Sequence, residues 1–212
     1  MESSLSDHEA TSPKSKLRIE NLSDLVFGLA LSIGSIILIS KLPQSPNDLV
    51  TSIVQFGFSF LIVIWVWTGY TRTMSALPFE ARGAFWLNIT LLFCVAIEPY
   101  LFYVVDQSPF SLLEFSSSVY ALDAGSMMLL LAGLVYLVKH AKGSGHQHVL
   151  DPSQLRKLDS SMYAEVVSGA VFFVSALPVF WLPSPVGSFL RFDVWYANFA
   201  LFFGVARVRR SG

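Results

Sequence analysis

Six long apolar runs, separated by short polar or Pro- and Gly-containing breaks, are the feature that most constrains this chain. A helix that crosses the hydrocarbon core of a bilayer needs about 20 mostly apolar residues, and each run is close to that length. The predicted membrane helices are 22–41, 50–71, 83–105, 118–139, 161–182 and 187–206. The sequence therefore predicts an all-α, polytopic membrane protein with six transmembrane helices; five is the alternative count, because the last two runs carry charged residues.

The composition agrees with a lipid environment. Hydrophobic residues make up 53% of the 212 and charged residues only 14%, whereas a soluble domain carries about a quarter charged residues. No polar stretch between the runs is long enough for a soluble domain. We therefore expect one membrane domain over 17–210, preceded by a polar, serine-rich tail over 1–16 that is disordered and lacks the apolar core of a signal peptide.

The positive charges predict the orientation, because Lys and Arg are retained on the cytoplasmic side during membrane insertion. If the N-terminus is inside, all but two of the 14 Lys and Arg face the cytoplasm, and only Lys41 and Arg191 lie outside. An even helix count also keeps the basic cluster over 207–210 inside. We therefore predict a multi-pass protein with both termini cytoplasmic, and a cell membrane is the simplest location.

The first run opens with the densest group of polar residues in the chain. Asp24 lies near the helix start, where free backbone N–H groups and the helix dipole favour a carboxylate. Arg18 precedes it by six residues and can pair with a carboxylate on this helix or a neighbouring one. The residues alone leave two interpretations open, a helix cap with an interfacial salt bridge or a functional polar network.

Two stripes run along this first helix. The apolar stripe consists of Leu29, Ile33 and Ile36, and the small-residue stripe consists of Gly28, Ser32 and Ser35. Small residues at such spacing let membrane helices approach closely, which favours ordinary packing. If several copies of the helix met around an axis, the same stripes would line a narrow apolar constriction and offer hydroxyls to an ion.

The opening motif resembles a known family. Arg-x-x-x-Leu-Ser-Asp at 18–24, followed by Leu-Val-Phe-Gly-Leu-Ala-Leu-Ser, is similar to the first-helix signature Arg-x-x-x-Phe-Ser-Asp of the transmembrane protein 175 family of potassium channels. The likeness continues through the membrane domain with Ser59-Phe60, Trp67, Trp86, Asn88 and Pro99. Only the first-helix motif is specific.

The resemblance implies a short, single-repeat, prokaryotic-type member: a passive cation channel, potassium-selective or potassium-preferring, built as a homotetramer with the first helix of each subunit around a central pore. The implied partners are potassium and other monovalent cations, the lipid bilayer and further copies of the chain, with no nucleic acid. The implied constriction is Leu29, Ile33 and Ile36, with the Ser32 hydroxyl facing the ion. The implied motif network is Arg18, Ser23, Asp24, Trp67 and Asn88.

Two residues depart from the family pattern. Leu22 replaces the Phe of the signature, and Tyr70 stands where the resemblance implies a second-helix His in contact with the Ser-Asp motif. We therefore expect the polar network around Asp24 to be built differently and the preference for potassium to be weaker or altered.

Carboxylates elsewhere in the apolar runs suggest an alternative function. Glu98, beside Pro99, either has a proton- or cation-linked role or lies at the outer water boundary, since a carboxylate within the membrane is costly. Asp123 and Glu165 are expected near opposite interfaces as solvated or salt-bridged residues. The alternative is a proton-coupled transporter that uses Glu98 and Asp24, although the chain shows no convincing internal repeat.

An enzyme or a non-conducting scaffold is the third possibility. The four histidines, His8, His140, His146 and His148, all lie outside the apolar runs, so acid–base catalysis within the membrane is poorly supplied. His146 and His148 form at most a weak metal site, and Cys94 is a lone, buried hydrophobe. We expect no enzyme activity, no cofactor and no bound metal.

Overall fold

The computed structural model describes residues 11–40, 42–76, 82–140, 152–183 and 189–211. These residues form six long α-helices and one short 3-10 helix. The elements are α2 (Thr11–Ser40), α3 (Pro46–Ala76), α4 (Arg82–Gln107), α5 (Phe110–His140), α6 (Pro152–Ser175), η1 (Pro178–Trp181) and α7 (Leu190–Ser211). Each long helix overlaps one of the predicted apolar runs, and the prediction of an all-α fold is confirmed.

Four of the helices are long and apolar enough to cross a membrane, by length and composition. Within the described residues, these spans are Ile19–Ser40, Pro46–Ser75, Gly83–Gln107 and Phe110–His140. Helices α6 and α7 are shorter and carry more polar residues. Four spans are therefore supported directly, and the fifth and sixth stay a prediction.

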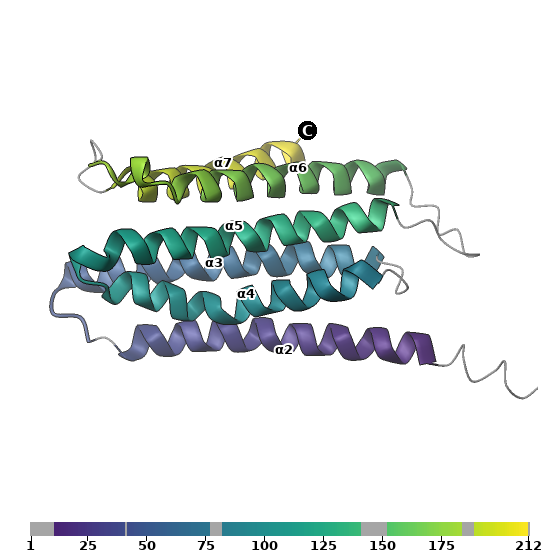
Figure 1. Cartoon of the computed structure of the whole chain (residues 1–212), viewed down its shortest axis with the longest axis horizontal. Coiled ribbons are helices and arrows are strands. Elements are labelled where there is room, and N and C mark those ends of the chain that lie inside the picture. The colour runs from purple at the N-terminus through teal and green to yellow at the C-terminus, as the bar shows by residue number, and fades with distance from the viewer. Residues whose placement is uncertain (1–10, 41, 77–81, 141–151, 184–188, 212) are drawn as a thin grey trace, which may run out of the picture.

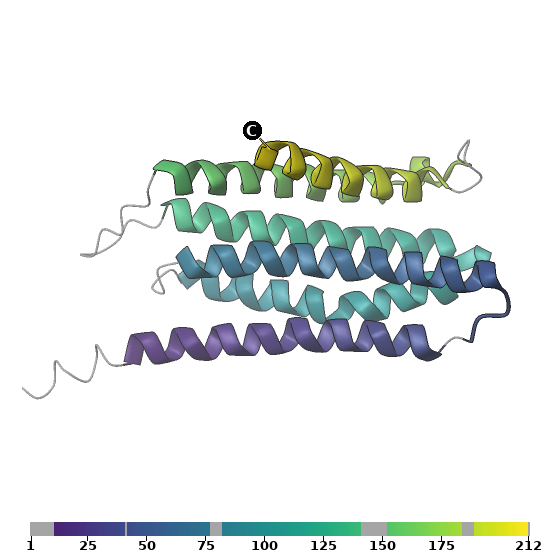
Figure 2. The same cartoon turned by 180° about the vertical axis from the view of Figure 1, so that it is seen from behind.

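The helices lie side by side in an elongated bundle (Figure 1), with α2 at one edge and α6 and α7 at the other. Helix α5 lies between these edges and packs against α3, α4 and α6. Helix α2 packs mainly against α3 and α4. The view from behind (Figure 2) shows the same order of helices across the bundle. One side of α2 is therefore uncovered in the single chain.

Two glycines bring α5 and α6 close together. A Cβ atom on Gly125 would lie 3.1 Å from the Gly169 carbonyl oxygen and 2.6 Å from the Phe173 ring, and one on Gly169 would lie 3.2 Å from the Gly125 carbonyl oxygen. Any larger residue at either position would push the helices apart. This is the close backbone approach that small residues permit between membrane helices.

Helix α6 ends at Ser175, earlier than the predicted limit of residue 182. Leu177 is extended, with φ −65° and ψ 146°, because a residue that precedes a proline is disfavoured in the helical region. Pro178 then starts the 3-10 turn η1. The apolar run thus continues beyond the helix, which hydropathy alone does not reveal.

Arg191, expected on the outer face of the membrane, is fully buried among three helices. Its guanidinium donates to the carbonyl oxygens of Ser175 at 2.8 Å and Glu114 at 2.7 Å, and to the Ser117 hydroxyl at 2.6 Å. It also lies over the Trp181 ring, 5.4 Å from the centroid. The carbonyls at the C-terminal end of α6 lack intrahelical partners and attract a cation. With its contacts to Glu114 and Ser117 near the start of α5, Arg191 joins α5, α6 and α7.

Replacing Arg191 by alanine should lower the free energy of unfolding by about 3 kcal/mol, because buried carbonyl groups lose a charged donor. Thermal or denaturant unfolding in detergent micelles measures the change. Arg156→Ala, at an exposed position of α6, is the matched control and should stay within about 0.5 kcal/mol of the wild type. Equal stability of the two variants would contradict this role for Arg191.

Candidate functional site: helix α2 and its polar contacts

Helix α2 has one buried and one exposed face. Ser23, Phe27 and Ala30 are at most 2% exposed and pack into the bundle. The opposite face is apolar and uncovered, with Leu25, Leu29, Ile33, Ile36 and Ile39 between 36% and 78% exposed. The spacing of these residues follows the helical repeat, so they form one continuous stripe along the length of α2.

The residues that the resemblance implies for a constriction all lie on this exposed face. Leu29 is 57% exposed, Ile33 is 36% exposed and Ile36 is 64% exposed. Ser32 is also exposed, and its hydroxyl donates to the Gly28 carbonyl oxygen at 2.8 Å. Because the proton of Ser32 is directed back to the helix, the lone pairs of its oxygen remain available to an outside group.

The small-residue stripe does not pack within the chain. A Cβ atom on Gly28 would meet nothing within 4 Å, whereas one on Gly34 would touch the Phe56 ring at 3.4 Å. Ser32 and Ser35 are exposed, and Ser35 donates to the Leu31 carbonyl oxygen at 3.0 Å. Gly34 therefore meets α3, and the stripe that includes Gly28 faces outward.

A buried hydrogen bond attaches the middle of α2 to α3, because α2 begins at Thr11. The prediction that Asp24 lies near the start of this helix is therefore wrong. The hydroxyls of Ser23 and Tyr70 lie 2.6 Å apart, and Ser23 donates to the Ile19 carbonyl oxygen at 2.8 Å. Because the Ser23 proton is used in this way, Tyr70 is the donor of the pair. The ring of Tyr70 packs against Phe27, with centroids 5.5 Å apart. Polar and apolar contacts together set the rotation of α2 about its own axis.

Two further residues of the implied network lie beside this bond. The Trp67 indole donates to the Asp24 carboxylate at 3.2 Å, again joining α3 to α2. Asn88 of α4 is 4% exposed, interacts with the Tyr70 hydroxyl, and leaves its own Oδ1 without a partner. The structure thus brings Ser23, Asp24, Trp67 and Asn88 to one region. Arg18 lies in α2, but its side chain is outside the described residues.

Glu98 lies inside the bundle instead of at a water boundary. It is 0% exposed, and its Oε1 accepts hydrogen bonds from Ser59 at 2.8 Å and Tyr120 at 2.9 Å. Of the two expectations for Asp123 and Glu165, solvated or salt-bridged, the first is wrong, since they are only 7% and 1% exposed, and Glu165 is attracted electrostatically by Arg72. Hydropathy gives the depth of a residue in a helix, but not which side of the helix faces its neighbours.

Asp24 and Glu98 do not form one site. Their contacts on α3 are Trp67 and Ser59, which are eight residues apart, or about 12 Å along a helix. Asp24 is exposed and Glu98 is enclosed. The geometry therefore gives no support to a transport cycle in which these two carboxylates exchange a proton directly.

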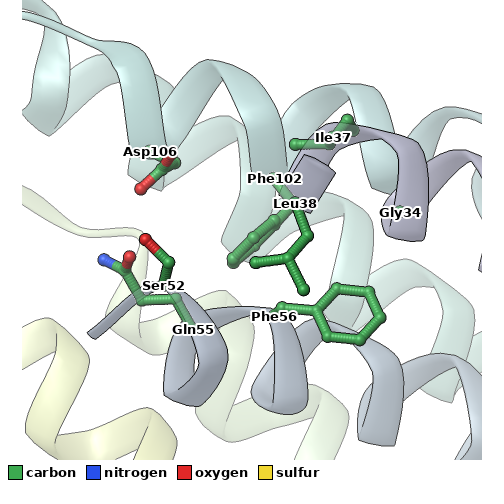
Figure 3. A pocket seen from close by; sticks show the side chains of 8 residues that line it. All are labelled: Gly34, Ile37, Leu38, Ser52, Gln55, Phe56, Phe102 and Asp106. Atoms are coloured by element: carbon green, nitrogen blue, oxygen red, sulfur yellow. The ribbon is translucent and has the colours of Figure 1, made fainter. Parts of the chain in front are cut away.

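The C-terminal part of α2 is held less tightly than its middle. A small open pocket (Figure 3) separates α2 from α3 and α4 there. Its lining has a polar side from Ser52, Gln55 and Asp106, and an apolar side from Gly34, Ile37, Leu38, Phe56 and Phe102. Hydrogen bonds to α3 fix the middle of α2, whereas apolar contacts around this pocket support its C-terminal end.

Among the described residues, no three His, Cys, Asp or Glu side chains are grouped to hold a metal ion. The weak site predicted at His146 and His148 lies outside the described residues. Cys94 is a buried free thiol, as expected for a lone cysteine.

Comparison with known proteins finds a family that the first part of this chain resembles. The family model described as "Endosomal/lysosomal potassium channel TMEM175" matches residues 18–99, which include the first-helix motif and its contacts on α3 and α4. The resemblance to the TMEM175 family is confirmed. A search of curated proteins finds no match.

Two solved structures of TMEM175 proteins share the fold. One is the crystal structure of a lysosomal potassium-selective channel TMEM175 homolog from Chamaesiphon minutus, with 19% identity, a TM-score of 0.59, and coverage of 91% of this chain and 98% of that chain. The other is a variant of the potassium channel MtTMEM175 bound to a nanobody fusion, with 18% identity, a TM-score of 0.57, and coverage of 92% and 94%. This chain thus has the fold of a multi-pass membrane protein of prokaryotic TMEM175 type.

The two departures from the TMEM175 signature have different surroundings. Leu22 is 55% exposed on the uncovered side of α2, so nothing within the chain depends on its identity. Tyr70 is 2% exposed and contacts Ser23, the contact that the resemblance implied for a histidine. The phenol hydroxyl of Tyr70 thus supplies the hydrogen bond to Ser23. The polar network forms at the implied position, with tyrosine as the donor in place of histidine.

Tyr70→Phe should lower the free energy of unfolding by about 1 kcal/mol, because it removes the buried hydroxyl and leaves the ring in place. Combined with Ser23→Ala, the loss should be less than additive by a similar amount, since both variants break the same bond. Unfolding in detergent measures the cycle, with Tyr163→Phe, whose ring is 73% exposed, as the control. Additive losses would mean that the two hydroxyls do not interact.

Proposed function

We propose that this chain is one subunit of a passive, potassium-preferring cation channel in which α2 lines the pore. The observation that carries the proposal is the uncovered face of α2, which combines large aliphatic side chains with hydroxyls and a carboxylate. The match of residues 18–99 to the TMEM175 family and the fold shared with two potassium channels support it.

The polar groups on the uncovered face favour a pore over a lipid contact. Asp24, Ser32 and Ser35 are all exposed there. A carboxylate in contact with lipid is costly, and polar side chains in membrane helices usually face a bundle interior or a water-filled path. Leu29, Ile33 and Ile36 between these groups would then narrow a path that is hydrated at both ends.

Four copies around a common axis would place the uncovered faces together. Closed cyclic assemblies are the usual form of homo-oligomers, and each copy then meets its two neighbours in the same way. Helix α2 is at the edge of the bundle, so its outer face can meet other copies without rearrangement of the chain. The number four rests on the family resemblance.

The proposed constriction has a simple physical action. Leu29 and Ile36 are seven residues apart, so the aliphatic side chains span about 10 Å along the axis. An ion that passes them loses part of its water shell, and a hydrophobic constriction can also exclude water altogether. The Ser32 oxygen lies within this span and can compensate part of the lost hydration, because its lone pairs face outward.

The proposal includes six membrane spans with both termini in the cytoplasm of a cell. Helices α6 and α7 supply the last two spans, and Arg191 satisfies the carbonyl groups at the turn between them. Lys139 pairs with Asp159, and this contact joins the ends of α5 and α6 on the proposed cytoplasmic side. The excess of Lys and Arg on that side supports the orientation.

Leu29→Ala and Ile33→Ala should each raise the rate of potassium flux, by about tenfold if the barrier falls by about 1.4 kcal/mol. The smaller side chain widens the constriction and lets water enter it. The measurement is potassium efflux from liposomes that contain the purified protein and are diluted into sodium.

Leu122→Ala is the matched control, because Leu122 is 41% exposed on α5 and away from α2. Its flux should equal that of the wild type. Unchanged flux in both α2 variants, or a monomeric mass for the protein in lipid nanodiscs, would contradict a pore built from several α2 helices.

Ser32→Ala should reduce the permeability ratio of potassium to sodium by about two- to tenfold, the effect of losing a ligand worth roughly 0.5–1.4 kcal/mol. Reversal potentials in planar bilayers measure the ratio. Ser126→Ala is the control, since the Ser126 hydroxyl makes the same contact with its own helix, to Leu122 at 2.7 Å, on α5. Equal ratios in both variants would remove Ser32 from the permeation path.

A further inference from the structure

A pair of buried carboxyl groups lies in the bundle, separate from the uncovered face of α2. Glu98 on α4 is 0% exposed and Asp123 on α5 is 7% exposed. Glu98 contacts Tyr120 and Asp123 contacts Cys94, and each contact lies about one helical turn from the other on both helices, so the two carboxyls are neighbours between α4 and α5. Each has one oxygen, Glu98 Oε2 and Asp123 Oδ2, with no hydrogen-bond partner. We infer that Glu98 and Asp123 form an exchangeable proton-binding site inside each subunit.

The contacts of Glu98 define half of this site. Its Oε1 accepts from the Ser59 hydroxyl of α3 and the Tyr120 hydroxyl of α5. Its Oε2 is enclosed and unpaired. A carboxylic acid places a proton on one oxygen and remains an acceptor at the other, so the neutral form suits this asymmetry better than the charged form.

Asp123 forms the other half. Its side chain interacts with the Cys94 thiol of α4, and its Oδ2 is buried without a partner. Buried polar atoms without a partner are uncommon and often mark a bound water or ion. A proton on either carboxyl, with a water between the two groups, would satisfy both unpaired oxygens.

Charge balance favours a proton over another cation. No Lys, Arg or His within the described residues forms an ion pair with Glu98 or Asp123. Burial of an unpaired carboxylate costs several kcal/mol, and the group usually neutralises instead. The described residues also hold no group of three acidic, Cys or His side chains that would suit a metal ion.

The neighbouring groups identify what else can titrate. Helix α3 contributes the Ser59 hydroxyl, which does not titrate in the accessible pH range, and α5 contributes Tyr120 and Asp123. Helix α4 contributes Cys94, and Tyr196 of α7 interacts with Tyr120. The two carboxyls are therefore the groups expected to exchange a proton.

The site can influence the pore through α4, a consequence that rests on the proposed channel function. Helix α4 packs against α2, and Glu98 precedes Pro99, where the helix lacks one backbone hydrogen bond and bends more easily. Loss of the proton would leave a charge among α3, α4 and α5, and water would have to enter to solvate it. The packing of α3 and α4 against α2 would then become looser.

The direct test is infrared difference spectroscopy of the reconstituted protein as the pH is raised. A protonated carboxylic acid has a C=O stretching band that its carboxylate lacks. The wild type should lose such a band on alkalinisation, and Glu98→Gln or Asp123→Asn should remove or alter it. Asp48→Asn is the control, because Asp48 is exposed at the start of α3 and should leave the band unchanged. A band unaffected by both core variants would overturn the proposal.

A second variant keeps the test informative if Glu98→Gln does not fold. Tyr120→Phe removes one donor to Glu98 Oε1 and therefore stabilises the carboxylate less, so the band should persist to higher pH than in the wild type. An unchanged transition in a folded Tyr120→Phe protein would place the proton elsewhere and overturn the assignment to Glu98.

Flux measurements test the link to the pore. The amide introduced by Glu98→Gln keeps an oxygen that accepts hydrogen bonds from Ser59 and Tyr120. This variant should therefore conduct at every pH, whereas wild-type flux should fall as the infrared band is lost. Wild-type and variant flux with the same pH dependence would overturn the link. The infrared result needs no conducting pore, so absence of any flux would count against the channel alone.

Discussion

The hydrogen bond between Ser23 and Tyr70 sets which side of α2 faces the bundle, and the rest of the candidate site follows from that choice. A helix can rotate about its axis at little cost when lipid and protein are equally apolar, so a buried polar pair is an effective way to fix the rotation. With Ser23 and Phe27 turned inward, Leu29, Ile33 and Ile36 must turn outward, because the helical repeat leaves them no other position.

The interior of this bundle is more polar than the apolar composition suggests. Glu98, Asp123, Glu165 and Arg191 are all at most 7% exposed, while Leu25, Ile36 and many other aliphatic side chains cover the outside. Lipid reverses the usual arrangement of soluble proteins, since hydrogen bonds between helices are available only inside. The hydrogen bonds of Arg191 stabilise the bundle in this way. The unpaired oxygens of Glu98 and Asp123 can still accept a hydrogen bond or a proton.

Helix positions could be predicted from the sequence because a bilayer demands long apolar runs, and the first-helix motif led to the family whose model matches residues 18–99. The end of α6 could not be predicted in this way. The run of apolar residues continues past Pro178, but the α-helix ends before this proline. The burial of Asp123, Glu165 and Arg191 could not be predicted either: hydropathy fixes their depth, but their burial depends on which helix lies opposite. Tyr70 was visible as a departure from the family, yet its contact with Ser23 required the fold.

Helix α2 is supported from one side only, and this asymmetry decides how the rest of the chain can move α2. Polar contacts hold its middle to α3, whereas its C-terminal end meets α3 and α4 across the small pocket at Ile37 and Leu38. A change in the spacing of α3 and α4 would therefore move the C-terminal end more than the middle. Because Ser59 and Glu98 join those same two helices, their hydrogen bond lies where a small change in the core would have the largest effect on α2.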